Sequence, residues 1–250
     1  MLYRNRELDH AFTFISESDF DIFCLQEVPE IFLKRLQTLS YHIIFRSERE
    51  VEIKNEFVHN FIVILSKHPI DTHGEIVHSD YWSQLPLRTR IFFRIMPAKL
   101  FTKIVNRKDL YADITIHGKS IRVFNLHLTL MHPTWRLKEF ETAMAERDES
   151  RPTIVCGDFN ILEAPHITIL NWILGGDIRD AAFYERERTT IEQRFIEHEL
   201  TNALKGGMTH PLSRSQLDHI LVSHSFKIQN AEVLPDSIGS DHHPIRVEIE

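Results

Sequence analysis

Short apolar runs recur along the chain between polar, turn-forming segments, and they differ in period. Runs that alternate apolar and polar positions, or that stay apolar for a few residues between turn signals, predict β-strands. Segments with apolar side chains three and four residues apart, such as Leu8, Phe12 and Ile15, predict amphipathic helices. Many strands with interspersed helices predict two packed sheets with helices outside, in one layered domain.

The helical period predicts helices at the start, after Pro29, over TWRLKEFETAMAER, and over residues 166–174 and 190–204. The strand period predicts strands at DFDIFCLQEV, YHIIF, FIVILSKHPI, TRIFFRI, AKLFTKIV, YADITIH, IRVFNLHL, PTIVCGDFN, QLDHILVS, KIQNAEVL and PIRVEIE. Two of these, YADITIH and IRVFNLHL, flank the turn signal at Gly118 and predict a hairpin. Residues 71–88 fit neither period and are expected to be irregular.

Composition narrows the class of protein. With 250 residues, 42% hydrophobic and 26% charged, the chain can bury the sizeable core of a globular protein. The net charge of −7 argues against a protein held on nucleic acid or anionic membrane by a global basic field. A local basic groove is still compatible with that charge.

The cysteines and the apolar runs bear on compartment. Cys24 and Cys156 lie inside apolar runs, which predicts buried free thiols rather than a disulfide framework. No run of eighteen apolar residues and no signal peptide is visible in the sequence. We therefore expect a cytoplasmic monomer without a membrane-spanning segment.

Several predicted strands end in polar residues that can bind a metal or carry a proton. The endings contain Glu27, Asn125 with His127, Asp158 with Asn160, Asp218 with His219, and Asp241 with His242 and His243. Asn125 and His127 are two residues apart, so both point to one face of their strand. Each ending alone has an ordinary explanation as a turn, a cap or a solvated side chain. Several such endings in one domain predict a shared site.

The residue types at these endings are suited to one kind of chemistry. Carboxylate and amide oxygens, without cysteine, are ligands for a hard cation such as Mg²⁺ or Mn²⁺, and Glu27 is the best candidate for a direct ligand. A histidine with a nearby carboxylate can transfer a proton or stabilise a developing charge. Neutral amides such as Asn125 and Asn160 can orient a phosphate or an attacking water. This set predicts metal-assisted attack of water on a phosphate ester.

The ordered series LQEV, ILSKHPI, NLHL, GDFN, LDHILVS and SDHHP resembles the endonuclease/exonuclease/phosphatase superfamily, from about Asp21 to the C-terminus. The series is specific as a whole, although GDFN alone would be a weak signal. That superfamily includes DNase I-like nucleases, abasic-site endonucleases, tyrosyl-DNA phosphodiesterases, sphingomyelinases and inositol-polyphosphate phosphatases. The resemblance implies a four-layered α/β sandwich, with two packed mixed β-sheets, outer helices and a site at one edge.

The resemblance also implies which residues hold the metal and the water. Glu27 matches the metal-binding glutamate, and Asp241 matches a site acid that is a further metal ligand. Asp158 and Asn160 match the pair that positions or activates the attacking water. The expected cofactor is therefore Mg²⁺ or Mn²⁺.

Four further residues match the phosphate side of the family site. His242 matches the catalytic histidine beside the scissile phosphate, and Asp218 matches the carboxylate that orients it. Asn125 and His127 match residues that contact the phosphate. The resemblance therefore implies that this pair faces the scissile phosphate.

One part of the family pattern is missing. The family opens with a strand that ends in a metal-binding Asn, whereas LYRNRELDHAF follows Met1 at once and corresponds to the later loop and helix. Asn5 lies on the wrong side of the gap to replace that Asn. We expect residues 1–250 to form a single domain of this type without the first strand. Either the sequence begins late or the protein lacks the strand; we favour the first, because an uncovered sheet edge is costly.

The site chemistry predicts a phosphoester substrate and leaves its class open. The first hypothesis is a metal-dependent phosphodiesterase that cleaves nucleic acid. The second is an enzyme for a phospholipid head group or a small phosphomonoester, and the third is a degenerate member that binds a partner without catalysis. The segment 71–90, with Tyr81, Trp82, Arg88 and Arg90, could stack a base and hold phosphates. We favour its other interpretation, a packed loop that leads into a strand.

Overall fold

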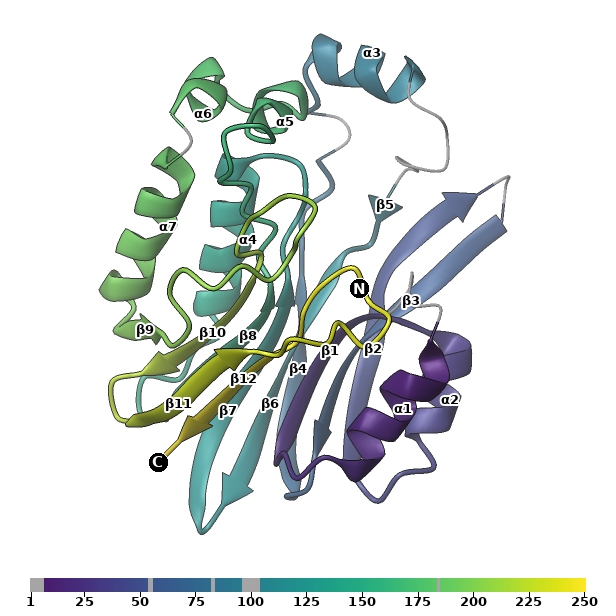
Figure 1. The fold of residues 1–250 in the computed structure, drawn as a ribbon, viewed down its shortest axis with the longest axis vertical. Coiled ribbons are helices and arrows are strands. Elements are labelled where there is room, and N and C mark those ends of the chain that lie inside the picture. The colour runs from purple at the N-terminus through teal and green to yellow at the C-terminus, as the bar shows by residue number, and fades with distance from the viewer. Residues whose placement is uncertain (1–6, 54–55, 82–83, 96–103, 184) are drawn as a thin grey trace.

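The computed structural model describes residues 7–53, 56–81, 84–95, 104–183 and 185–250 (Figure 1). The elements in chain order are α1 Leu8–Glu17, β1 Ile22–Pro29, α2 Glu30–Leu36, β2 His42–Ile53, β3 Glu56–Ser66, β4 Ile70–Val77, α3 Leu87–Ile95, β5 Ile104–Val105, β6 Lys108–Ile116, β7 Lys119–His127, α4 Pro133–Met144, β8 Thr153–Asp158, α5 Ile169–Ile173, α6 Ile178–Ala182, α7 Arg186–Glu197, β9 Leu200–Asn202, β10 Asp218–Ser223, β11 Ile228–Val233 and β12 Ile245–Ile249. The helices in the described part of the chain lack the combined length and apolar character needed to cross a membrane.

Two sheets form the centre of the molecule. The first has four strands in the order β1-β3-β2-β5, and the second has six in the order β4-β6-β7-β8-β10-β9. Neighbouring strands are antiparallel except β7 and β8, which are parallel. A parallel pair needs a crossover connection, and helix α4 provides it. Strands β11 and β12 form a separate antiparallel pair beside the sheets (Figure 1).

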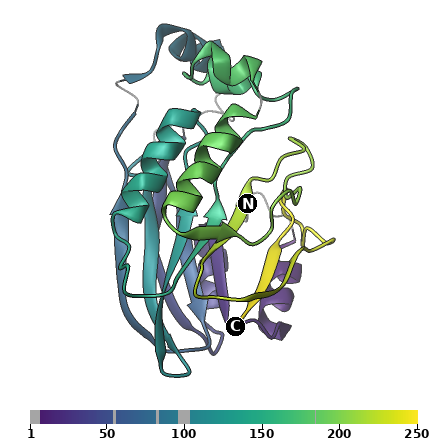
Figure 2. The ribbon, with the colours of Figure 1, turned by 90° about the vertical axis from the view of Figure 1, so that its left-hand side faces the viewer.

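Alternating apolar side chains bury both faces of each sheet. In β3, Ile62 and Ile64 belong to the core between the two sheets, whereas Val63 and Leu65 pack with the residues of α1 and α2. Phe124 of β7 faces the other way, into the core that α4 and α7 cover. The order of layers is therefore helices, sheet, sheet, helices (Figures 1 and 2). The expected four-layered sandwich is confirmed.

The predicted hairpin is confirmed, since β6 and β7 pair from Leu110–Asn125 to Ile116–Lys119 around Gly118. Two expectations are wrong. Residues 70–77, expected to be mostly irregular, form β4 at the edge of the second sheet, where one exposed face weakens the apolar pattern. The helix expected over 190–204 begins at Arg186, ends at Glu197 and is followed by β9.

A third expectation is wrong because tertiary contacts decide a short ambiguous run. TRIFFRI was expected to be a strand and lies in helix α3. Arg88 Nε donates to the carbonyl oxygen of Trp172 at 2.9 Å, and Thr89 Oγ1 donates to that of Ile173 at 2.8 Å, so the helix is fastened to the end of α5. Of the expected strand AKLFTKIV, Ile104–Val105 form β5, and the rest lies outside the described residues.

Candidate active site

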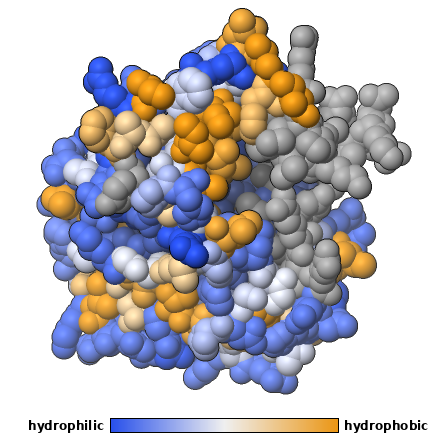
Figure 3. All heavy atoms as spheres, turned by 45° about the horizontal axis from the view of Figure 1, so that its top comes forward, coloured by the Kyte–Doolittle hydropathy of each residue, from blue (hydrophilic) through white to orange (hydrophobic). Residues whose placement is uncertain are grey.

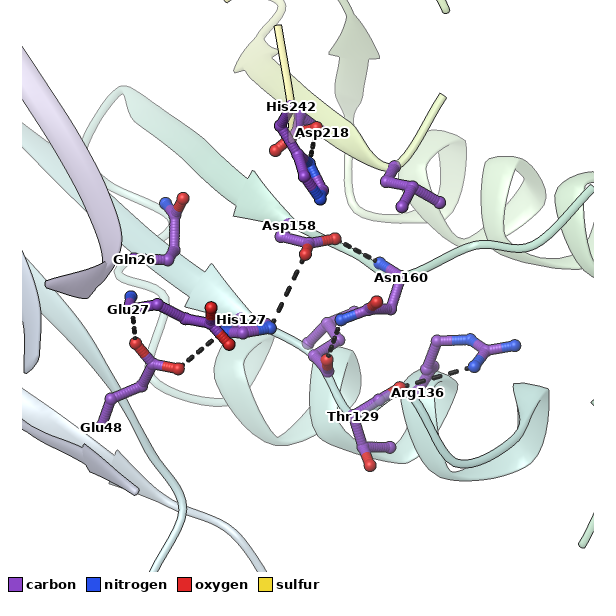
Figure 4. A network of polar contacts seen from close by, with 12 residues as sticks. Gln26, Glu27, Glu48, His127, Thr129, Arg136, Asp158, Asn160, Asp218 and His242 are labelled. Atoms are coloured by element: carbon purple, nitrogen blue, oxygen red, sulfur yellow. Dashed lines mark hydrogen bonds and ion pairs between the residues drawn. The ribbon is translucent and has the colours of Figure 1, made fainter. Parts of the chain in front are cut away.

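Polar side chains converge at one end of the second sheet, where β7 and β8 end and β10 begins (Figure 4). His127 is in register with Asp158 across the parallel pair β7 and β8. Asp158 is in register with Asp218 across the antiparallel pair β8 and β10. Because residues in register share a face of the sheet, these three side chains lie side by side.

Gly157 and Asn160 give the GDFN segment its shape. Gly157 has φ 144°, and a Cβ there would overlap the carbonyl oxygen of Leu126, so only glycine lets β8 approach β7 this closely. Asn160 has φ 53°, a conformation unusual for a residue with a side chain. Its backbone N–H donates to Asp158 Oδ1 at 2.8 Å, and its Nδ2 donates to the carbonyl oxygen of Leu128 at 2.8 Å. Asn160 therefore fixes the carboxylate of Asp158 against the end of β7.

His242 and Asp218 form a buried hydrogen-bonded pair beside Asp158. His242 Nδ1 lies 2.7 Å from Asp218 Oδ2, and one ligand atom from each of the three residues lies within 4.8 Å of the others. Burial alone would lower the pKa of His242, but the charges of Asp218 and Asp158 and the hydrogen bond to Asp218 raise it to about 9. The imidazole is therefore positively charged at neutral pH, with Nδ1–H donating to Asp218.

A second acid–histidine pair lies on the other side of Asp158. His127 Nδ1 is 2.5 Å from Glu48 Oε1, and its Nε2 is 3.6 Å from Asp158 Oδ2. Burial opposes a charge on His127, but Glu48, Asp158 and Glu27 together raise its pKa. Asp158 thus stands between two imidazoles, each held by its own carboxylate (Figure 4).

Glu27 lies in a β-bulge of β1, where the register shifts between Leu25 and Val28. Its φ of 54° is rare for a residue with a side chain, and such strained backbone persists only where the surroundings hold it. Glu48 supplies part of that support, because its Oε2 accepts the backbone N–H of Glu27 at 2.6 Å. The Glu27 side chain is buried and forms one cluster with Glu48 and His127, with ligand atoms within 4.8 Å of one another.

The donors at this end of the sheets fit a hard divalent cation. Asp158 Oδ2 is buried and, among the described residues, accepts no hydrogen bond, as expected of an oxygen reserved for a ligand. Carboxylates dominate the surrounding set, and no sulfur is present among the clustered ligand residues. Glu27 and Asp241, the two residues expected to bind metal, fall in different clusters: Asp241 groups with His210 and His242.

Asn125 shares a face of β7 with His127 but lies deeper between the sheets. Its Oδ1 accepts from Gln26 Nε2 at 2.6 Å, and its Nδ2 donates to the carbonyl oxygens of Leu25 at 3.1 Å and Val63 at 2.9 Å. The expectation that Asn125 faces the scissile phosphate stays a prediction. Its amide ties β7 to the first sheet beneath the site.

His219 and His243 lie outside the clusters around Asp158. His219 is fully buried; Arg188 Nη1 donates to its Nε2 at 2.5 Å, and its Nδ1 donates to the carbonyl oxygen of Leu217 at 3.0 Å. Burial and the charge of Arg188 lower the pKa of His219 to about 3, so this histidine is neutral. His243 Nδ1 donates to the carbonyl oxygen of Leu234 at 3.0 Å.

Tyr81, in the segment 71–90, is packed rather than open for stacking on a base. Tyr81 is buried and stacks on Trp135, with ring centroids 4.2 Å apart. Arg90 Nε donates to the carbonyl oxygen of Leu85 at 2.8 Å. Trp82 lies outside the described residues. The packed-loop interpretation describes Tyr81 correctly, although the loop leads into helix α3 and not into a strand.

Sequence patterns did not indicate Glu48 or His210. Glu48 is one of several charged residues in FRSEREVEI, and a register shift between Ser47 and Arg49 is what sets it apart from its neighbours. His210 lies in the loop before β10, with its ring 4.7 Å from the ring of His242. Neither position carries a signal that separates it from the other glutamates and histidines of the chain.

Comparisons with known proteins show the family and the fold. The pattern of the Endonuclease/Exonuclease/phosphatase family matches residues 2–242. No curated protein matches the sequence significantly. Similar solved structures include an endonuclease/exonuclease/phosphatase family protein from Leptotrichia buccalis, with 16% identity, a TM-score of 0.64, and coverage of 98% of this chain and 92% of that one.

Two further similar structures are of proteins named for an activity. One is a mannosyl-6-phosphatase from Bacteroides thetaiotaomicron, with 19% identity, a TM-score of 0.59, and coverage of 98% of this chain and 91% of that one. The other is the 3′ phosphatase NExo from Neisseria bound to a product DNA hairpin, with 16% identity, a TM-score of 0.59, and coverage of 98% and 94%.

The layered fold and the carboxylate–histidine clusters are those of a class of hydrolases that act on phosphoester bonds. The chain belongs to the endonuclease/exonuclease/phosphatase family. Enzymes of this family generally depend on a divalent metal, which the acidic and histidine clusters suit.

Proposed function

We propose that the protein is a divalent-metal-dependent phosphodiesterase that hydrolyses nucleic-acid phosphodiester bonds, with water as the nucleophile. The observation that carries the proposal is the place of Asp158 between the His242–Asp218 and His127–Glu48 pairs. The similarity to the DNA-bound Neisseria phosphatase supports nucleic acid as the substrate class.

Different side chains act on the attacking water and on the phosphate. Asp158, fixed by the Asn160 N–H, is placed to orient the attacking water and to accept its proton. Charged His242, held by Asp218, offers its Nε2–H to a phosphoryl oxygen on which negative charge develops. His127 offers a second imidazole on the opposite side of Asp158. A divalent cation held by carboxylates of these clusters, with Glu27 as the first candidate ligand, would supply further stabilisation of that charge.

The test is a substrate panel assayed with Mg²⁺, with Mn²⁺ and with a chelator. The panel contains single- and double-stranded DNA, RNA, phosphatidylcholine and sphingomyelin vesicles, and sugar phosphates, and His242→Ala serves as the matched inactive control. We expect nucleic-acid cleavage that needs the divalent ion and disappears in His242→Ala. Absence of cleavage of any nucleic acid by the wild-type protein would overturn the proposal.

A second candidate substrate is a phospholipid head group, and one surface feature favours it. Helix α3 exposes Leu87, Ile91 and Ile95 along one side, and Figure 3 shows apolar side chains gathered on this face of the molecule. A shallow hollow of about 260 Å³ between α3 and α5 has an almost wholly apolar lining. Exposed apolar area of this kind suits contact with a lipid surface.

The same panel separates the remaining candidates. Release of phosphocholine or of phosphate, with nucleic acid left intact, would select the phospholipid or the small phosphomonoester, and the similarity to the mannosyl-6-phosphatase keeps the latter in the panel. Absence of all turnover would select a non-catalytic binding member of the family. Any turnover that is lost in His242→Ala would dispose of that last candidate.

A further inference from the structure

The backbone pairing between β6 and β7 ends two residues before His127. Leu110 and Asn125 are its last pair, so the backbone N–H and carbonyl of His127, which point toward β6, lie beyond it. The side chains of Arg107 and Asp109, on either side of the first residue of β6, take the place of the missing backbone partners. The His127 N–H donates to Asp109 Oδ1 at 2.8 Å, and Arg107 Nη2 donates to the His127 carbonyl oxygen. Buried backbone groups need such partners.

The two residues after His127 are also held by hydrogen bonds. The Leu128 N–H donates to the carbonyl oxygen of Asp158 at 2.9 Å, and its own carbonyl oxygen accepts from Asn160 Nδ2 at 2.8 Å. The Thr129 N–H donates to Glu139 Oε2 at 2.6 Å. Every backbone N–H of the segment 127–129 is therefore bound, two of the three by a buried carboxylate.

Arg107 and Glu139 join these contacts into one charged network. Arg107 Nη1 donates to Glu139 Oε1 at 2.6 Å, so a single guanidinium links the carbonyl of His127 to the carboxylate that holds Thr129. Glu139 is fully buried. Asp109 makes a further contact, because its Oδ2 lies 2.8 Å from Nε2 of the buried His78. Charge-assisted hydrogen bonds of this kind are stronger and more directional than neutral ones.

We infer that Arg107 and Asp109 are positioning residues that set the place of the His127 imidazole against Asp158, by holding the His127 backbone where strand pairing has ended. The inference rests on the proposed function for its effect on rate, because a shift of His127 against Asp158 affects the rate only if these residues serve phosphoester hydrolysis. Displacement by a fraction of an ångström should then lower kcat and leave substrate binding nearly unchanged.

The test compares the two ends of one hairpin. Arg107→Met removes the guanidinium that donates to the His127 carbonyl oxygen and to Glu139. Arg107→Lys retains the positive charge but has fewer directed donors. The matched control is Arg122→Met at the far end of β7, since Arg122 pairs with Asp113 at 2.8 Å and its side chain is 13% exposed, as is that of Arg107. We expect Arg107→Met to lower kcat roughly 10²-fold with KM within about twofold, Arg107→Lys to recover part of that loss, and Arg122→Met to retain kcat.

Amide hydrogen exchange of the free protein gives a readout that does not depend on a substrate. We expect faster exchange at the amides of residues 127–129 in Arg107→Met and in Asp109→Ala than in Arg122→Met. Unchanged protection there, or an equal loss of kcat in Arg122→Met, would overturn the inference. If the wild-type protein cleaves no phosphoester, the proposed function fails, and exchange alone decides whether the two residues hold the segment. If Arg107→Met does not fold, Arg107→Lys carries the same comparison.

Discussion

His127 and His242 stand on either side of Asp158, each paired with a carboxylate, yet the chain holds them in different ways. His127 ends a central strand, and buried charged side chains bind both its N–H and its carbonyl. His242 lies in the loop before β12, and its N–H donates to a single serine hydroxyl, Ser240 Oγ, at 3.2 Å. The His127 imidazole therefore projects from a strand with a firmly bonded backbone, whereas the His242 imidazole projects from a loop and contacts Asp218.

The difference bears on how each histidine could serve a reaction. A ring fixed through its backbone keeps one distance from Asp158 whatever the ligand, which suits orientation. A ring fixed through its carboxylate partner can follow the phosphate as charge develops, while Asp218 maintains its positive charge. We therefore expect His242 to act directly on the phosphoryl group and His127 to contribute mainly through the geometry of Asp158.

The largest expected effect comes from removing the groups that act in the transition state. His242→Ala and Asp158→Ala should each lower kcat by roughly three powers of ten or more, because each removes a proton-transferring or charge-stabilising group. The measurement is kcat and KM on the best substrate of the panel. His219→Gln is the control for loss of a buried histidine, and it should change kcat by less than about threefold in protein that remains folded.

A smaller loss of kcat is expected when the His127–Glu48 pair is changed. His127→Ala should lower kcat by about two powers of ten, and Glu48→Gln by about one, because the amide can still accept the Glu27 N–H but no longer attracts a charged imidazole. Steady-state kinetics at fixed metal concentration measure both variants. A larger loss in His127→Ala than in His242→Ala would reverse the roles given to the two histidines.

The next largest loss of kcat is expected when Asp218, the carboxylate that maintains the charge of His242, is replaced. Asp218→Asn should lower kcat less than His242→Ala, because the ring stays in place. Without the Asp218 charge, only Asp158 opposes the effect of burial, and the pKa of His242 should fall from about 9 toward its ordinary value. NMR titration of the imidazole in metal-free protein measures the shift. A pKa that stays near 9 in the variant would show that Asp218 is not its cause.

The same pair predicts how stability changes with pH. The folded-state pKa of His242 is raised, so its contribution is fully present below pH 6.5, the ordinary histidine pKa, and is lost as the pH rises through about 9. Asp218→Asn should therefore destabilise the protein most near pH 6 and least near pH 10. Denaturant unfolding at the two pH values checks the sign.

The sequence predicts the parts of the site that follow from strand register. Asp158, Asp218 and His127 end or begin neighbouring strands, so their convergence needs only the correct sheet order. Position on a strand face says nothing about depth, so the sequence alone does not show that the Asn125 amide bonds to the first sheet. Glu48 could not be found, because a local shift of register, invisible in the sequence, sets its surroundings.

The smallest expected effect tests the looser attachment of His242. Ser240→Ala removes the neutral acceptor of the His242 N–H, which is one ordinary hydrogen bond, while the ring retains Asp218. We expect kcat to fall by less than about tenfold, since a neutral hydrogen bond contributes about 1 kcal/mol. Kinetics beside Asp109→Ala, which removes the acceptor of the corresponding His127 N–H, give the comparison. A larger loss in Ser240→Ala would mean that His242, too, depends on its backbone, and the contrast between the two pairs would not hold.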